Sequence, residues 1–212
     1  MALNYYKNEL KENAQLLASK GKGILAVDES TKTVGKRLAG IGVENTEENR
    51  KAYRGMLFTT EGLGKYISGA ILFEETLFQN HPDGESMVKK LNDLGIIPGI
   101  KVDKGLNPLP GGGDVETFCS GLDGLVERAA KYYEQGARFA KWRAVLQITG
   151  DGCPSKLSIQ ENAWGLARYA RSVQESGLVP IIEPEILMDG DHTIEKTAEV
   201  QEEVIKQVYI AC

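Results

Sequence analysis

The sequence predicts an α/β fold in which helices cover a parallel β-sheet. Two observations predict it: apolar runs of strand length recur along the chain with little alternation, and segments with helical spacing lie between them. Continuous apolar runs are typical of strands covered on both faces, which occur in parallel sheets. The runs cover residues 23–28, 69–74, 98–103, 138–146 and 178–186. For any single run a buried helix segment is the alternative.

Helical spacing comes first at the N-terminus, where residues 1–17 (MALNYYKNELKENAQLL) predict an amphipathic helix. This segment carries acidic residues and has no apolar centre, so it is not typical of a signal or transit peptide. Further helices are predicted from three groups of apolar residues: Tyr53, Met56 and Leu57 after Thr46; Met87, Val88, Leu91 and Leu94; and Phe118, Leu122 and Leu125.

The most regular helix is predicted over residues 155–175, with Pro154 before it and Gly177 after it as start and stop signals. A last helix follows the fifth run. Its apolar positions are Val200, Val204, Ile205 and Val208. We expect Trp142 and Trp164 to pack between the strands and the outer helices.

Strand and helix alternate, which leaves a doubly wound open sheet and a (β/α)8 barrel as alternatives. The position of the charged residues favours the barrel, because barrel enzymes take their catalytic side chains from the carboxyl ends of several strands. Charges that stand late in the five runs are Asp28, Glu74, Lys101, Lys141 and Glu183. No glycine-rich phosphate-binding turn, typical of the doubly wound fold, follows the first run.

Two runs end in charged pairs spaced two residues apart: Lys141 with Arg143, and Glu183 with Glu185. Residues i and i+2 of a strand point to the same face, so each pair projects two charges in one direction. Buried charges at strand ends are costly unless they serve a polar site. The pattern therefore indicates an active site, with a structural ion-pair network between neighbouring strands as the alternative.

Composition narrows the class of protein further. The chain has 212 residues, 42% of them hydrophobic, and a net charge of −5, and it has no basic stripe typical of nucleic-acid binding. No apolar stretch is long enough to span a membrane. The three cysteines have no paired spacing and predict reduced thiols.

Two motifs have simpler explanations than ligand binding. The glycine-rich run 110–114 (PGGGD) lacks the G-K-[ST] ending of a phosphate loop and predicts a flexible connector. Asp189, Asp191 and His192 could suggest a metal site, but with two histidines in the whole chain we expect no metal and a solvated turn.

Taken together, several segments make the chain resemble class I fructose-1,6-bisphosphate aldolase, from the first helix to the last residue. They are GKGILAVDEST, KRLAGIGVENTEENR, SGAILFEETLFQ, PGIKVDKG, GLDGLVERAAKYYEQGARFAKWR and LVPIIEPEILMDGDH. The resemblance implies a (β/α)8 barrel and reversible cleavage of fructose 1,6-bisphosphate through a lysine Schiff base, without a cofactor. The segments GLGKYISGAILFEETL and NAWGLARYA are similar to the plastid branch of plants and algae.

The resemblance also implies roles for individual residues. Asp28 matches the aspartate that handles the substrate hydroxyl. Lys101 matches a lysine at the third strand, Lys141 matches a lysine beside the reacting carbonyl, and Arg143 would complete a positive wall. Clustered ammonium groups are expected to lower each other's pKa and to attract an anionic bisphosphate.

Four further residues match family positions. Glu183 matches the glutamate that moves protons during imine formation, and Glu185 is expected to hold the lysines in position. Arg37 and Arg50 match positions associated with the phosphate ends of the substrate.

One family feature does not occur in this sequence. In the family the Schiff-base lysine lies on the sixth strand. Residues 1–212 are expected to form one incomplete domain of about five βα units, which does not include that lysine. Two interpretations follow: a piece of an aldolase, or an inactive short isoform that acts as a binding or regulatory protein. A third makes Lys141 the imine former of a shortened enzyme.

The resemblance also carries expectations for the whole protein. The substrate is a sugar bisphosphate, and the full-length family is typically a homotetramer. Neither nucleic acid nor a membrane is expected as a partner. The plastid stroma is the expected location, with the cytoplasm as the alternative.

Overall fold

The computed structural model describes the backbone of residues 2–212 and the side chains from residue 5 onwards. Five parallel strands form one sheet in the order β1-β2-β3-β6-β7. Their bounds are β1 Gly23–Val27, β2 Ile67–Leu72, β3 Ile97–Lys101, β6 Phe139–Leu146 and β7 Val179–Ile186. All five apolar runs are therefore strands, as predicted. Because each strand pairs with its predecessor in this sheet, the order is that of a barrel and not of a doubly wound fold.

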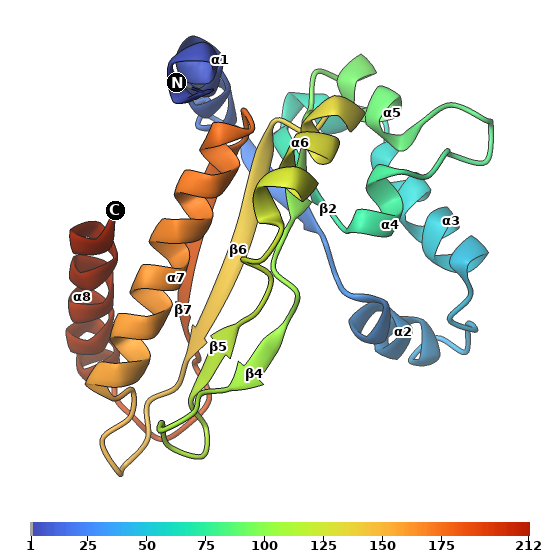
Figure 1. Ribbon diagram of the computed structural model, residues 1–212. Coiled ribbons are helices and arrows are strands. Elements are labelled where there is room, and N and C mark those ends of the chain that lie inside the picture. The colour runs from blue at the N-terminus through green and yellow to red at the C-terminus, as the bar shows by residue number, and fades with distance from the viewer. Residues whose placement is uncertain (1) are drawn as a thin grey trace.

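Helices separate the strands (Figure 1). They are α1 Ala2–Leu17, α2 Thr31–Ala39, α3 Glu47–Phe58, η1 Leu63–Lys65, α4 Glu74–Leu77, α5 Met87–Asp93, α6 Leu125–Gln135, α7 Lys156–Glu175 and α8 Ile194–Ala211. Five of them begin after a Ser or Thr whose hydroxyl oxygen accepts the N–H three residues on: α2, α3, α5, α7 and α8. Local N-capping thus fixes where these helices begin.

One predicted helix was partly wrong. Phe118 lies in a short strand, β5 Thr117–Cys119, which pairs antiparallel with β4 Leu106–Pro108. The helix begins only at Leu125, after Gly124 in the left-handed conformation. Helical spacing over three residues did not distinguish this hairpin from a helix turn. The PGGGD run lies in the turn between β4 and β5, as the prediction of a connector requires.

The hairpin turn is fastened to the start of α7 by a buried carboxylate. Glu116 is 4% exposed, and it accepts hydrogen bonds from the backbone N–H of Gly113 at 2.8 Å and from the hydroxyl of Ser155 at 2.9 Å. These donors outweigh the burial that alone would raise the pKa of Glu116, and they hold that pKa below its ordinary value.

The main core lies between the sheet and the helices that follow β5 and β6. Trp142 on β6 is 2% exposed and stacks on Tyr169 of α7, with ring centroids 5.4 Å apart. The Tyr169 hydroxyl donates to the carbonyl of Ala140 at 2.7 Å, so the helix is bonded directly to the strand. The prediction for Trp142 is confirmed. That for Trp164 was wrong, because its side chain is 54% exposed on the outer face of α7.

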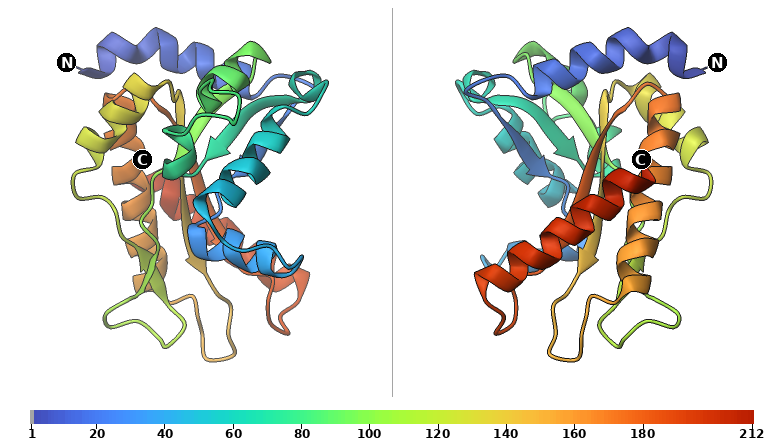
Figure 2. Two further views of the ribbon diagram at one scale, coloured as in Figure 1. Left: turned by 90° about the vertical axis from the view of Figure 1, so that its right-hand side faces the viewer. Right: turned by 90° about the vertical axis from the view of Figure 1, so that its left-hand side faces the viewer.

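A second apolar cluster fills the amino-terminal end of the sheet. Phe139 of β6, fully buried, packs with Leu17 at the end of α1 and Ile71 of β2. Helix α1 lies across this end of the sheet (Figure 2). The Phe139 ring occupies the space over Gly99 of β3, where an added Cβ would lie 2.2 Å from Phe139 Cζ. Glycine at this position is therefore what allows the ring to lie against the sheet.

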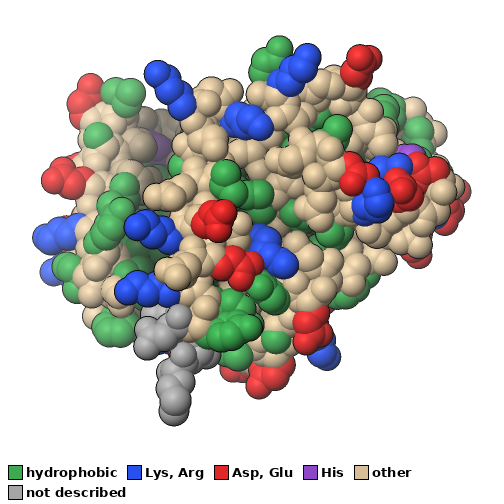
Figure 3. Space-filling view, turned by 90° about the horizontal axis from the view of Figure 1, so that it is seen from above, with side chains coloured by type: hydrophobic (Ala, Val, Ile, Leu, Met, Phe, Trp, Pro, Cys, Tyr) green, Lys and Arg blue, Asp and Glu red, His purple; other side chains and the backbone are tan. Residues whose placement is uncertain are grey.

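The last helix packs with Val200, Val204 and Val208 towards the core, as predicted. Ile205 is 41% exposed, because it falls on the outward side of this face. No helix among the described residues is long and apolar enough to cross a membrane. Seen from the α1 end, charges of both signs are interspersed over the surface (Figure 3).

Candidate functional site

A cleft of about 350 Å³ opens at the carboxyl ends of the strands. Five of the predicted site residues line it: Asp28, Lys101, Lys141, Arg143 and Glu183. Asp28 directly follows β1 and Lys101 ends β3, whereas Lys141, Arg143 and Glu183 lie within the longer strands β6 and β7. They meet because the strands are parallel and Lys141 lies opposite Lys101 in the register of the sheet. The sheet therefore gathers the predicted charges into one place.

Lys141 is the centre of this group. Its Nζ lies 3.1 Å from Asp28 Oδ2 and 2.9 Å from Glu183 Oε2, and its side chain is 11% exposed. Burial alone would lower the pKa of Lys141, but the two carboxylates outweigh burial and raise that pKa above its ordinary value. The expectation that neighbouring ammonium groups lower it was wrong, since each lysine has its own carboxylate partner. Lys141 is therefore a charged ammonium at neutral pH.

Arg143 and Glu185 form a second ion pair between β6 and β7. In the strand register Lys141 lies opposite Ile181, and Arg143 lies opposite Glu183. Each cation nevertheless bonds the carboxylate two residues further along β7. Glu185 thus holds Arg143, not a lysine as expected.

The Arg143–Glu185 contact shifts the pKa of both groups. It raises the pKa of Arg143 and lowers that of Glu185. Among the side chains described, Arg143 makes its hydrogen bond through Nε alone, so the two terminal nitrogens of its guanidinium are available to a ligand.

Lys101 is paired with a residue that the sequence-based assignment left out. Its Nζ lies 2.5 Å from Asp103 Oδ1, and the Asp103 side chain is 5% exposed. Lys101 and Asp103 are also two residues apart at a strand end, the same spacing that singled out the pairs of β6 and β7. Applied to the third run, that signal would have found Asp103.

Ser30, Thr33 and Cys119 place uncharged polar groups in the wall of the cleft. Ser30 and Thr33 lie at the start of α2, and their hydroxyl oxygens are 3.1 Å apart. Cys119 of β5 places its thiol against the carbonyl of Arg143, and burial raises the pKa of this thiol to about 12. The thiol is therefore protonated at neutral pH. No pattern in the sequence marks these three residues, and only the fold shows that they lie near Asp28 and Arg143.

Arg37 and Arg50 do not line the cleft. Arg37 is on α2, 60% exposed, and pairs with Glu29. Arg50 of α3 donates to both carboxylate oxygens of Glu75, at 2.9 and 2.5 Å. Of their two carboxylate partners, Glu29 lines the cleft and Glu75 does not.

Glu74, the late charge of the second run, also lies away from the cleft. It bonds Lys104 at 2.9 Å and the Tyr132 hydroxyl at 2.8 Å. These two partners outweigh burial, which alone would raise the pKa of Glu74, and they hold that pKa below its ordinary value.

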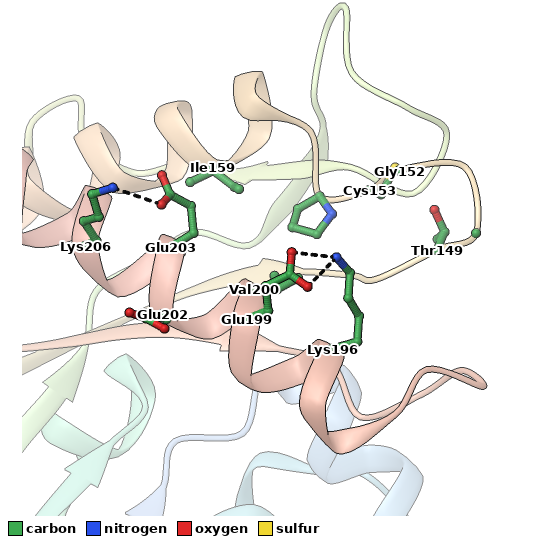
Figure 4. A pocket seen from close by; sticks show the side chains of 12 residues that line it. Thr149, Gly152, Cys153, Ile159, Lys196, Glu199, Val200, Glu202, Glu203 and Lys206 are labelled. Carbon is green, nitrogen blue, oxygen red and sulfur yellow. Dashed lines mark hydrogen bonds and ion pairs between the residues drawn. The ribbon is translucent and has the colours of Figure 1, made fainter.

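A larger cavity of about 690 Å³ lies elsewhere, between the β6–α7 link and α8 (Figure 4). Two ion pairs lie in its lining: Lys196 binds Glu199 at 3.0 Å, and Lys206 binds Glu203 at 3.4 Å. None of the predicted site residues lines it. Within the described part of the chain, no group of three or more His, Cys, Asp and Glu side chains could hold a metal ion.

Fold and site together define a barrel-type α/β protein whose site consists of lysine, arginine and carboxylate side chains at strand ends. Comparison with known proteins names the family. The model of class I fructose-bisphosphate aldolase matches residues 9–212, so the chain belongs to this family.

Individual relatives agree with the family model. Chloroplastic fructose-bisphosphate aldolase 3 of Arabidopsis thaliana is 60% identical over 96% of this chain, and fructose-bisphosphate aldolase 1 of Toxoplasma gondii is 62% identical over the same share. A solved fructose-bisphosphate aldolase of Plasmodium falciparum, in complex with TRAP and a small molecule inhibitor, superposes with a TM-score of 0.95 at 57% identity over 97% of this chain. The chain spans about half the length of the curated relatives, 51% and 56%, and 59% of the solved chain.

Proposed function

We propose that the cleft binds fructose 1,6-bisphosphate and takes part in its reversible cleavage to dihydroxyacetone phosphate and glyceraldehyde 3-phosphate. The observation that carries the proposal is the ion-paired group of Asp28, Lys141 and Glu183, which β1, β6 and β7 bring together in an open cleft. A lysine held between two carboxylates can pass protons to and from a substrate that enters between them. Membership of the aldolase family supports the choice of reaction.

The proposed roles follow from the contacts. Asp28 takes the proton of the substrate hydroxyl during carbon–carbon cleavage, because its carboxylate is fixed by Lys141 at a strand end. Glu183 moves protons to and from the oxygen that leaves as water when the carbinolamine forms and dehydrates, next to the same ammonium group. Lys141 stabilises negative charge that develops on oxygen.

The imine is assigned to the sixth-strand lysine that the family resemblance implies, and not to Lys141. A lysine attacks a carbonyl as the neutral amine, and the two carboxylates keep Lys141 charged. This argument disfavours the alternative in which Lys141 forms the Schiff base.

Phosphate recognition is assigned to Lys101, Arg143 and the hydroxyls of Ser30 and Thr33. The terminal nitrogens of Arg143 suit bidentate contact with a phosphate, and Ser30 and Thr33 stand where α2 begins. Lys101 and Arg143 already have carboxylate partners, so a phosphate has to compete with these carboxylates for the two cations. Arg37 supports this wall indirectly through Glu29, which lines the cleft, whereas Arg50 is paired with Glu75 outside it.

For the whole protein we propose a homotetramer and a plastid location. Chloroplastic relatives from Arabidopsis, spinach and rice support the location, and the Toxoplasma relative is equally similar. In that compartment the reaction would serve the Calvin cycle as well as glycolysis.

Calorimetric titration of the 212-residue chain tests the proposed binding. Fructose 1,6-bisphosphate is expected to bind in a salt-dependent way, whereas fructose is not, because the cleft recognises phosphate. Lys101→Met is expected to weaken binding about tenfold, the equivalent of about 1.4 kcal/mol. The matched control is Lys104→Met, which removes an exposed lysine outside the cleft wall. Equal losses in both variants, or equal binding of fructose, would refute the proposal.

A further inference from the structure

Arg54 of α3 is a fully buried cation that the proposed chemistry does not use. Its side chain is 0% exposed, among the largest buried side chains of the protein, and it does not line the cleft. Burial lowers the pKa of Arg54, and Glu29 and Glu75 oppose that effect. A buried charge is costly unless its hydrogen bonds are satisfied, so the contacts of this guanidinium indicate what it does.

Those contacts join two strand ends. One terminal nitrogen donates to the carbonyl of Glu29 at 2.6 Å, and the other donates to the Thr76 hydroxyl at 2.9 Å. Glu29 follows Asp28 directly, and Thr76 belongs to α4, which follows β2. The guanidinium also lies over the ring of Phe73, 5.5 Å from its centroid. Arg54 therefore bridges the segments that leave β1 and β2.

The bridge lies just beyond the last residue of β1 that is hydrogen-bonded to the sheet. Pairing between β1 and β2 ends at Val27 opposite Leu72, one residue before Asp28. Within the described sheet β1 has a neighbour on one side only. Beyond Val27 the ladder no longer fixes the backbone, so the bond from Arg54 to the carbonyl of Glu29 is the next anchor after it.

We propose that Arg54 is a positioning residue, which holds the peptide after Asp28 so that the Asp28 carboxylate stays within reach of Lys141. The planar guanidinium suits this task because it bonds two acceptors in different directions at once, which an ammonium group on a flexible stem does not do as rigidly. The inference rests on the proposed function for the catalytic role of Asp28, but the ion pair itself can be tested without a substrate.

The test is competitive labelling of lysines with limiting acetic anhydride across a pH series, read by peptide mass spectrometry on this chain without ligand. The rate of Lys141 is measured against that of exposed Lys206. In Arg54→Met the Asp28 carboxylate is expected to leave Lys141, so the pH profile of Lys141 moves to lower pH and its relative rate rises about threefold or more. The profile of Lys206 is expected to stay in place.

Two variants separate positioning from general destabilisation. Asp28→Asn is expected to shift the Lys141 profile as Arg54→Met does, and the double variant is expected to add nothing, because both changes act on one ion pair. Arg138→Met, which removes an arginine bonded to Glu9 at the other end of the sheet, is expected to leave the profile unchanged.

An unchanged Lys141 profile in folded Arg54→Met would overturn the inference, as would a uniform rise in the labelling of all lysines. If Arg54→Met does not fold, Thr76→Val removes one end of the bridge and is expected to give a smaller shift in the same direction. No shift in that variant would overturn the inference as well. A negative result of this labelling experiment does not refute the proposed function, because the labelling is done without ligand. The proposed function is tested separately by the titration with fructose 1,6-bisphosphate.

Discussion

Replacing Gly99 with alanine is expected to lower the free energy of unfolding by about 3 kcal/mol, the upper end of the usual cost of overpacking. The added Cβ would lie 2.2 Å from Phe139 Cζ and 2.4 Å from both Cε atoms of the same ring. Phe139 is fully buried against Leu17 and Ile71, so it cannot move aside without displacing its neighbours. Urea unfolding measures the effect as a lower midpoint.

Gly23→Ala is the matched control, because Gly23 is also a strand glycine and nothing lies within 4 Å of an added Cβ. Its stability is expected to change by at most about 0.5 kcal/mol. Phe139→Leu should relieve the clash, so the double variant with Gly99→Ala is expected to lose less than the sum of the two single changes. A Gly99→Ala variant as stable as the Gly23→Ala control would contradict the packing described here.

Replacing Lys141 with methionine is expected to cost about 2 kcal/mol of stability and to abolish binding of fructose 1,6-bisphosphate. Removing one partner of a buried ion pair costs more than the pair contributes, because the remaining charge is left without compensation. Asp28 is the more buried carboxylate, with a side chain 10% exposed, whereas Glu183 is 37% exposed and partly solvated. The expected cost is therefore below the full range for buried pairs.

The pH dependence of this effect follows from the sign of the pKa shift. The pKa of Lys141 is raised above its ordinary 10.5, so its stabilisation is complete at neutral pH and is lost only as the pH rises through the raised value. Asp28→Asn in the Lys141→Met background is expected to restore part of the stability. The control Lys104→Met should have little effect, since Lys104 and Glu74 form an exposed pair. If both lysine variants are equally stable, the charge of Lys141 is not compensated as described.

Much of the fold could be predicted from local pattern. The five strands were found because strands of a covered parallel sheet are apolar throughout, and α7 was found because Pro154 and Gly177 bracket a regular helical face. The wrong helix over Phe118 and the wrong burial of Trp164 have a common cause. Both depend on which partner lies opposite in space, and neither partner can be identified from a few neighbouring residues.

The site was predictable as a set of residues but not as a set of bonds. Spacing at strand ends identified Lys141, Arg143, Glu183 and Glu185, because i and i+2 share a face. It did not show that each cation bonds a carboxylate two residues beyond its register partner on β7. For this reason Glu185 pairs with Arg143 and not with a lysine. Arg54 was not singled out either, since an arginine in a charged helix gives no sign that it is buried.

The central claim is that Lys141 is a charged proton-handling group in a sugar-bisphosphate site and not the lysine that forms the imine. Borohydride reduction of the chain at a fructose 1,6-bisphosphate concentration that saturates the calorimetric titration tests it directly, with intact mass and peptide mapping as the readout. The account predicts that neither Lys141 nor Lys101 carries a reduced adduct. A substrate adduct on Lys141 would contradict it, because only the neutral amine of that lysine could have formed the trapped imine.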